Sequence, residues 1–451
     1  MRSLFPLAFL LTLLLGAPAV GTLAAQDPTP VRIQSFELPN GLKVHLVEDH
    51  SAQVVAVNVW YDVGSRDERV GRTGFAHLFE HMMFQGSANV GKTEHAQFVE
   101  RAGGMYNGST QPDRTNYYNV LPSNRLNLAL WLEADRMRSL AVTAENLRNQ
   151  QEAVKEERRL RFDNQPYFGT LIDSLPTMFN AERCFAYAHS IIGSMDDLNA
   201  ASVEDVQAFF DLYYAPNNAT LVITGDVQPA EARRLVTEYF GGIERGQQPP
   251  AVECAAQGGT GVEVVRRVTD KNATLPAALT AYRTVGPSHA DHPALELLST
   301  ILGVGESSRL NRALVRESKV AVAAQGLFNP FGPMRGAGIF GVLAIANQGV
   351  SIDTVQAQVL RQVVASADAI TPDELLKAKN SWRAQTIFSR QEALAVSEAV
   401  HYAAMYLGSA DAVNTDAARY KAVTVADLRR VARTYLRPEN SLTLLIVPEG
   451  R

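Results

Sequence analysis

The order of hydrophobic and polar positions predicts a mixed fold of strands and helices. Residues 41–47 and 53–61 are apolar runs rich in β-branched side chains, and we expect two strands there, separated by a polar turn. Apolar residues at helical spacing then recur on both sides of a hairpin-like stretch. These patterns predict helices near 73–84 and 93–102, a hairpin within 105–122, and helices near 123–140 and 143–163. Because strands and helices do not alternate regularly, the fold expected is α+β, with mostly antiparallel sheets packed with helices.

The same pattern recurs near the end of the chain. Residues 202–225 and 424–447 align without a gap: each begins with a Ser/Thr-x-x-Asp capping pattern, continues as an amphipathic helix, breaks at a proline and enters an apolar strand. The two copies lie about half the chain apart, which indicates a duplication. We therefore expect two tandem homologous domains, at 30–245 and 261–451, joined by the Gln-, Pro- and Gly-rich linker 246–260.

Residues 1–25 have the features of a secretory signal peptide. Arg2 precedes an uncharged apolar run at 5–15, and small residues follow up to Ala25. An uncleaved membrane anchor is the alternative, but the run is shorter than the roughly 20 apolar residues that a membrane span requires. We expect cleavage after Ala24 or Ala25 and export of a chain without a membrane span.

Composition narrows the possible partners. The chain is 46% hydrophobic and 20% charged, with a formal net charge of −5 and no basic block, so nothing in it favours nucleic acid or an anionic membrane surface. Its two cysteines, Cys184 and Cys254, have no second Cys or His at metal-ligand spacing. Export allows them to form a disulfide, but two free thiols are an equally good interpretation of the sequence.

The segment GFAHLFEHMMFQGS carries the strongest chemical signal. It places His77, Glu80 and His81 at positions i, i+3 and i+4, on one face of a helix. Two imidazoles one turn apart can share a zinc ion while the carboxylate accepts a proton from an activated water, in the inverted order of the His-Glu-x-x-His zinc helix. The alternative is a helix whose histidines are satisfied by hydrogen bonds alone. The apolar neighbours predict burial, which favours a metal.

A catalytic zinc needs a third protein ligand, since Glu80 serves as the base. At about 100° per residue, Glu157 shares the apolar face of the 143–163 helix and lies between Val154 and Leu160. A carboxylate on that face requires a partner. Glu157 is thus the candidate third ligand, with an ion pair to Arg158 or Arg161 as the alternative.

With these residues in place, the chain resembles the pitrilysin/insulinase family of zinc peptidases, and in particular its short, processing-peptidase-like members. The likeness rests on the His-x-x-Glu-His motif, on Glu157 within VKEERR, and on GGMYNGSTQPDRTNYY, DNQPYF, IIGSMDDL and YYAPNNATLVITGD, and it continues more weakly through GVGESSRLNRALVRE. The resemblance implies one Zn²⁺ per chain, held by His77, His81 and Glu157, with Glu80 as general base.

The resemblance also implies how a substrate binds. Members of the family add an extended peptide as a strand beside the zinc, and the matching segment here is Met105, Tyr106, Asn107 and Gly108. Extended or unfolded peptides are then the expected substrates of an endopeptidase. With the signal sequence, the resemblance places the protein in the periplasm.

Two departures from the family pattern are visible. Some relatives have a glutamate where this chain has Gln150. Members that complete the site from their C-terminal half use an Arg/Tyr pair, and Val315 and Val322 occupy those positions. We therefore expect a heterodimer with a related subunit that supplies the pair, or a homodimer. A non-catalytic peptide-binding or assembly subunit of the same fold, and a zinc hydrolase of other substrates, are the alternative functions.

Overall fold

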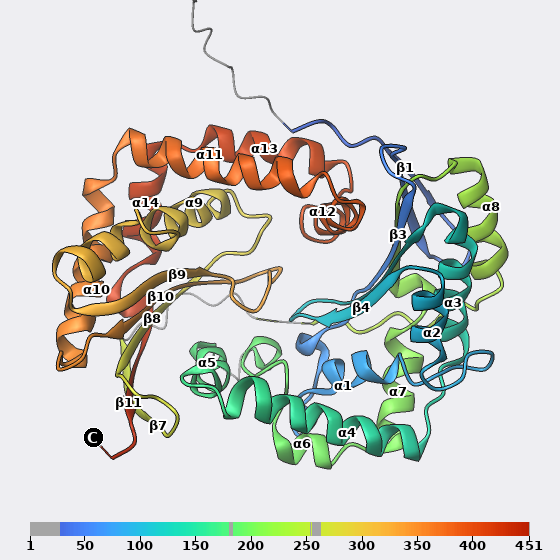
Figure 1. The fold of residues 1–451 in the computed structure, drawn as a ribbon, viewed down its shortest axis with the longest axis horizontal. Helices are drawn as coiled ribbons and strands as arrows, with labels where there is room; N and C mark the ends of the chain where they lie inside the picture. The colour runs from blue at the N-terminus through green and yellow to red at the C-terminus, as the bar shows by residue number, and fades with distance from the viewer. Residues whose placement is uncertain (1–27, 180–183, 253, 255–262, 451) are drawn as a thin grey trace, which may run out of the picture.

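Two β-sheets, one in each half of the chain, form the framework of the part of the protein that the structure describes (Figure 1). The computed structural model describes residues 28–179, 184–252, 254 and 263–450. The predicted signal peptide lies outside the described residues, as do residues 253 and 255–260 of the predicted linker. Within the described ranges, no helix combines the length and the apolar character needed to cross a bilayer.

The first sheet has six strands in the order β1-β2-β6-β3-β5-β4. Its strands are β1 (Ile33–Glu37), β2 (Lys43–Glu48), β3 (Val54–Tyr61), β4 (Met105–Thr110), β5 (Thr115–Pro122) and β6 (Ala219–Gly225). All neighbours are antiparallel except β2 and β6. The two predicted strands correspond to β2 and β3, and the predicted hairpin corresponds to β4 and β5. Among the described strands β4 pairs with β5 alone, so it stands at an edge of the sheet.

The second sheet repeats five strands of the first in the same order, β7-β11-β8-β10-β9. Its strands are β7 (Val264–Asp270), β8 (Ala277–Thr284), β9 (Ala321–Phe328), β10 (Gly338–Ala346) and β11 (Ser441–Pro448). As β6 does with β2 in the first sheet, β11 runs parallel to β7, and it runs antiparallel to β8. The expected α+β architecture of two related domains is confirmed, although the repeat alone could not show that β1 has no counterpart among the strands that the structure describes.

Helices surround the two sheets. In the first half they are α1 (Phe75–Met82), α2 (Glu94–Arg101), α3 (Leu126–Ser139), α4 (Ala144–Arg158), α5 (Phe168–Ser174), α6 (Met195–Asn199), α7 (Val203–Tyr213) and α8 (Pro229–Phe240). In the second half they are α9 (His292–Gly303), α10 (Ile352–Ala369), α11 (Pro372–Ser389), α12 (Ala393–Tyr406), α13 (Ala412–Ala422) and α14 (Val425–Tyr435). The four helices predicted before residue 164 correspond to α1 to α4, with a π-helical turn at Arg159–Asp163 closing α4. The repeated capping pattern starts α7 and α14, where Ser202 and Thr424 each form a capping box.

Each half also contributes a helix to the other half. Helix α12 packs against β3 and β6, and its Val396 and Val400 are buried against Val222 of the first sheet. In exchange, α5 and the turn after it place Leu171 and Leu175 against the second sheet. Figure 1 shows α12 beside the first sheet and α5 below the second. The two halves are therefore joined through their cores, and between them lies a cavity of about 980 Å³.

Candidate active site

Helix α1 turns three polar side chains toward this cavity and its apolar side chains toward the core. Leu78, Phe79 and Met82 are buried in the first core, since the helix packs against β4, β5 and α4. His77 and Glu80 line the cavity, as does His81 one position later. The side chain of His77 is only 12% exposed. The burial expected from the sequence is thus present.

Glu157 reaches the two histidines from the last turn of α4. Its Oε2 atom lies 3.2 Å from Nε2 of His81 and 3.6 Å from Nε2 of His77. One possible ligand atom from each of the three residues falls within 4.8 Å of the other two. The imidazole rings stand 4.9 Å apart and nearly perpendicular. The structure therefore brings together the three side chains that the sequence singled out as candidate ligands.

Of the two apolar neighbours that the helical-face argument gave Glu157, the structure buries only one. Val154 is buried, but Leu160 is 56% exposed because it lies in the π-helical turn, where the spacing of side chains departs from 100° per residue. The alternative partner is also present, since Nη1 of Arg161 lies 2.8 Å from Oε1 of Glu157. The carboxylate thus faces Arg161 with one oxygen and the histidines with the other. Arg158 binds Asp173 instead.

An outer contact orients one of the two histidines, His81. Oε1 of Gln150, on α4, lies 3.3 Å from Nδ1 of His81. An amide oxygen only accepts, so Nδ1 of His81 carries a proton and Nε2 faces Glu157. Among the described residues, buried Nδ1 of His77 has no hydrogen-bond partner.

Burial and charge set the protonation of these groups. Burial lowers the pKa of His77 to about 4, so this imidazole is neutral near pH 7. For His81, burial is outweighed by the hydrogen bond to Glu157 and by the charge of Glu80, and the pKa is raised. The hydrogen bond from His81 lowers the pKa of Glu157. The cluster therefore offers a neutral imidazole, a proton-holding imidazole and an ionised carboxylate.

Glu80 stands beside this cluster and is held from β4. Thr110 donates a hydrogen bond of 2.7 Å to Oε2 of Glu80. Burial raises the pKa of the Glu80 carboxyl, which makes the carboxylate a stronger base than an exposed one. Gly108 lies so close that a Cβ there would be 3.1 Å from Cγ of Glu80. The strand and the helix thus meet with little room between them.

Three of the four predicted substrate-binding residues line the cavity: Tyr106, Asn107 and Gly108. Met105 lies outside it and is 54% exposed at the start of β4. The backbone N–H of Gly108 donates to the side chain of Asn107.

The opposite wall of the cavity was not foreseen. It is largely apolar and comes from α5 and the second half: Tyr167, Phe168, Leu171, Leu175, Leu327, Phe331, Met334 and Ile339 are among its residues. No local motif marks these positions, because they meet the cavity only through the packing of the two halves. Val315 packs in the second core and Val322 is 47% exposed on β9, and neither lines the cavity.

Comparison with known proteins decides the family. The sequence profile of the family described as Insulinase (Peptidase family M16) matches residues 43–174, and that of the Peptidase M16 inactive domain matches residues 200–381. The zinc protease PqqE of Helicobacter pylori is 30% identical over 456 aligned residues, which cover 99% of both chains. The chain belongs to the insulinase (M16) peptidase family.

Other members of the insulinase family agree in sequence and in structure. Mitochondrial-processing peptidase subunit beta of Dictyostelium discoideum is 24% identical, with 94% of this chain and 91% of that chain aligned. The crystal structure of a protease from Helicobacter pylori superposes with a TM-score of 0.86 at 27% identity, covering 93% of this chain and all of that one. The second match to the family falls on residues 200–381, whose sequence contains no His-x-x-Glu-His motif.

Proposed function

We propose that this protein is a zinc-dependent endopeptidase that cleaves extended or unfolded peptides. The observation that carries the proposal is the convergence of His77, His81 and Glu157 beside Glu80 at the wall of a large cavity. Relatives named zinc proteases support it. We assign His77, His81 and Glu157 as the metal ligands and Glu80 as the general base.

The donor set fits zinc. Two imidazoles and a carboxylate are a common ligand set for catalytic zinc, and a neutral His77 has no proton to lose before it coordinates. Gln150 accepts the Nδ1 proton of His81, which leaves Nε2 for the metal. When bound, zinc supplies a Lewis acid that acidifies water and polarises a carbonyl oxygen.

In this proposal Glu80 carries out both proton transfers, and Thr110 positions its carboxylate. Glu80 takes the proton of the attacking water on its carboxylate and returns it to the leaving amine. Thr110 holds Oε2 of Glu80, so that Oε1 is left to face the reacting atoms. Burial keeps water from competing for these hydrogen bonds and strengthens them.

Strand β4 provides the proposed binding edge. Because β5 is the only partner of β4 in the described part of the chain, a substrate in extended conformation can add to the free side of β4 along Tyr106, Asn107 and Gly108. A folded domain would not enter a cavity of about 980 Å³, whereas a peptide segment would. The apolar opposite wall favours substrates with bulky apolar side chains.

A second subunit is part of the proposal. Val315 and Val322 supply neither an Arg nor a Tyr, so we propose a heterodimer with a related chain that carries this pair, or a homodimer that functions without it.

The export pattern at 1–25 supports location in the periplasm.

The test is the zinc content and peptidase activity of the purified mature chain, measured on a quenched unstructured peptide, alone and with a candidate partner. We expect one zinc per chain and metal-dependent cleavage. His77→Ala should lose both, whereas His50→Ala, at a half-exposed histidine bound to Glu48 and Asp226, should lose neither. Zinc binding without cleavage under either condition would favour the non-catalytic subunit. Absence of zinc would refute the metal site.

A further inference from the structure

The start of the metal-bearing helix is held by a carboxylate from outside the helix. Gly74, at the N-cap of α1, has no side chain with which to cap it. Glu68 takes over this role: its Oε2 accepts from the backbone N–H of Gly74 and its Oε1 from that of Ala76, each at 2.8 Å. The carboxylate is fully buried. Two of the otherwise unpaired N–H groups at the helix start are thus satisfied by one side chain.

A buried histidine holds Glu68 in turn. Nε2 of His189 lies 3.0 Å from Oε2 of Glu68 and 2.9 Å from the carbonyl oxygen of Ser65. Nδ1 of His189 lies 2.9 Å from the carbonyl oxygen of Phe185. Because acceptors face both nitrogens, the geometry suits an imidazolium that donates from both. Glu68 and His189 therefore form a buried ion pair behind the first turn of α1.

Stability alone is a poor explanation for this pair. Removing two charges from water has a penalty that their attraction offsets only in part, so a buried ion pair is a weak source of stability. Helices α7, α11 and α14 of this chain are capped locally by Ser202, Thr371 and Thr424. Position 74 cannot carry a capping side chain of that kind, because an added Cβ would lie 2.6 Å from the carbonyl oxygen of Ile192, so the cap of α1 comes from a residue outside the helix. Helix α1 differs from these three helices because the first turn, which Glu68 caps, carries the candidate metal ligand His77.

The segment that carries His189 also reaches the second metal-bearing helix. Gly74 adopts φ of 84° and packs so closely on this segment that a Cβ would be 2.6 Å from the carbonyl oxygen of Ile192. Arg158, next to Glu157 on α4, donates to the carbonyl oxygen of Gly193 at 2.6 Å. One segment therefore contacts the N-terminus of α1 and the end of α4, which carry the candidate ligands.

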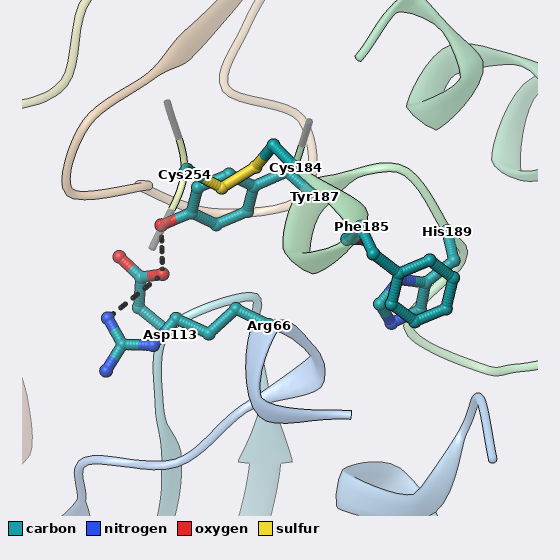
Figure 2. The surroundings of a disulfide bond; sticks show 7 residues. All are labelled: Arg66, Asp113, Cys184, Phe185, Tyr187, His189 and Cys254. Atoms are coloured by element: carbon teal, nitrogen blue, oxygen red, sulfur yellow. Dashed lines mark hydrogen bonds and ion pairs between the residues drawn. A yellow bond between two sulfur atoms is a disulfide. The ribbon is translucent and has the colours of Figure 1, made fainter. Parts of the chain in front are cut away.

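A disulfide anchors this segment at its other end. Cys184 is bonded to Cys254, and Tyr187 donates to Oδ1 of Asp113 at 2.8 Å. Figure 2 shows the disulfide and Tyr187 on one side of the turn and the stacked rings of Phe185 and His189 on the other. The sequence left disulfide and free thiols open, and the structure has the disulfide. It places a covalent tie five residues before His189.

We propose that Glu68 and His189 are positioning residues for the metal site: they fix the first turn of α1 against the 184–193 segment, so that His77 meets His81 and Glu157 in ligating geometry. The inference rests on the proposed zinc site. It adds that the affinity of this site depends on two side chains that are not metal ligands, one of which, His189, also lines the cavity.

The experiment compares the zinc affinity of the mature chain with that of three variants, by competition with a fluorescent chelator and zinc as the only ligand. Glu68→Gln puts a donor where acceptors are needed, and His189→Leu removes the donor to Glu68. We expect each to weaken zinc binding about 10- to 100-fold. Thr424→Ala, the matched control, removes the local cap of α14, far along the chain, and should leave zinc affinity within about twofold of the wild-type value.

Amide hydrogen exchange of residues 75–82 without zinc separates the inference from the proposed function. We expect faster exchange there in Glu68→Gln than in Thr424→Ala. Wild-type zinc affinity in both site variants would overturn the inference while leaving the zinc site intact. A wild-type chain that binds no zinc would overturn both. If Glu68→Gln fails to fold, His189→Gln takes its place, because its amide keeps an N–H donor for Glu68. We expect its zinc affinity to lie between that of His189→Leu and that of the wild type. Wild-type zinc affinity in both His189→Gln and His189→Leu would overturn the inference.

Discussion

Gln150 lies on the opposite side of the His81 imidazole from Glu157, with its Oε1 atom 3.3 Å from Nδ1 of His81. A hydrogen bond at this place fixes both the tautomer and the plane of a ligating ring. The family resemblance implies a glutamate at this position in some relatives. An amide accepts the same proton without adding charge, so this chain keeps the orientation and gives up some ligand basicity.

Replacing Gln150 tests how much that contact matters. Gln150→Ala should weaken zinc binding about 10-fold or more, because Nδ1 loses its acceptor and the ring can turn. Gln151→Ala is the matched control on the same helix, since the Gln151 amide donates to Leu198 and Ala201 instead. Competition with a chelator measures both variants. Equal affinities for Gln150→Ala and Gln151→Ala would contradict the orienting role.

Glu80→Gln separates binding from turnover. The amide keeps the size of the side chain, and we expect zinc content to stay at one per chain while kcat falls about 1,000-fold, within the range typical of a lost general base. Metal analysis and cleavage of a quenched peptide measure the two quantities on one preparation. Substantial turnover in a purified variant, free of wild-type enzyme, would end the assignment of Glu80 as base.

The pH dependence of zinc binding follows from the two histidines. His77, with a pKa lowered to about 4 by burial, is already unprotonated in the neutral range. His81 has a pKa raised above 6.5, so zinc must displace its proton. Apparent affinity should therefore fall about tenfold per pH unit as pH drops below the raised pKa of His81. A second proton should enter only near pH 4, the pKa of His77.

The measurement is the apparent zinc dissociation constant across this pH range, made in the wild-type protein because the charge of Glu80 contributes to the raised pKa of His81. A slope of two protons just below pH 6.5 would mean that both histidines are protonated in the free protein. A flat profile would mean that neither is. Either result would contradict the unequal environments of His77 and His81.

Much of the site was predictable because its information is local. The spacing of His77, Glu80 and His81 places all three on one face of any helix, and Glu157 could be picked out by its position relative to Val154. The same reasoning failed at Leu160, where a π-helical turn changes the spacing. The repeat likewise predicted two related domains, because the capping boxes of α7 and α14 recur in sequence.

What the sequence did not predict depends on contacts between distant segments. The exchange of α5 and α12 between the halves leaves no periodic signal, since each helix has an ordinary apolar face whichever sheet it covers. The cap of α1 was missed for the same reason. Glu68 lies six residues before Gly74 and His189 more than a hundred after it, so only the folded chain shows that they act on one helix.

Gly108 provides a final test, of how closely β4 must approach α1. In Gly108→Ala, the added Cβ would lie 3.1 Å from Cγ of Glu80 and 3.2 Å from the carbonyl oxygen of Asn116. These contacts are too tight to accept without movement, and the backbone of β5 yields less readily than the Glu80 side chain. We expect Glu80 to shift, kcat to fall about tenfold or more and zinc content to stay unchanged.

The control for this change is Gly242→Ala, where the added Cβ meets no atom of the described residues within 4 Å. That variant should keep full activity and metal. If Gly108→Ala raised KM while leaving kcat unaltered, the glycine would serve the approach of the peptide to β4 rather than the placement of Glu80. A loss of zinc in Gly108→Ala would show instead that β4 supports the ligands, because α1 would then have moved as a body rather than Glu80 alone.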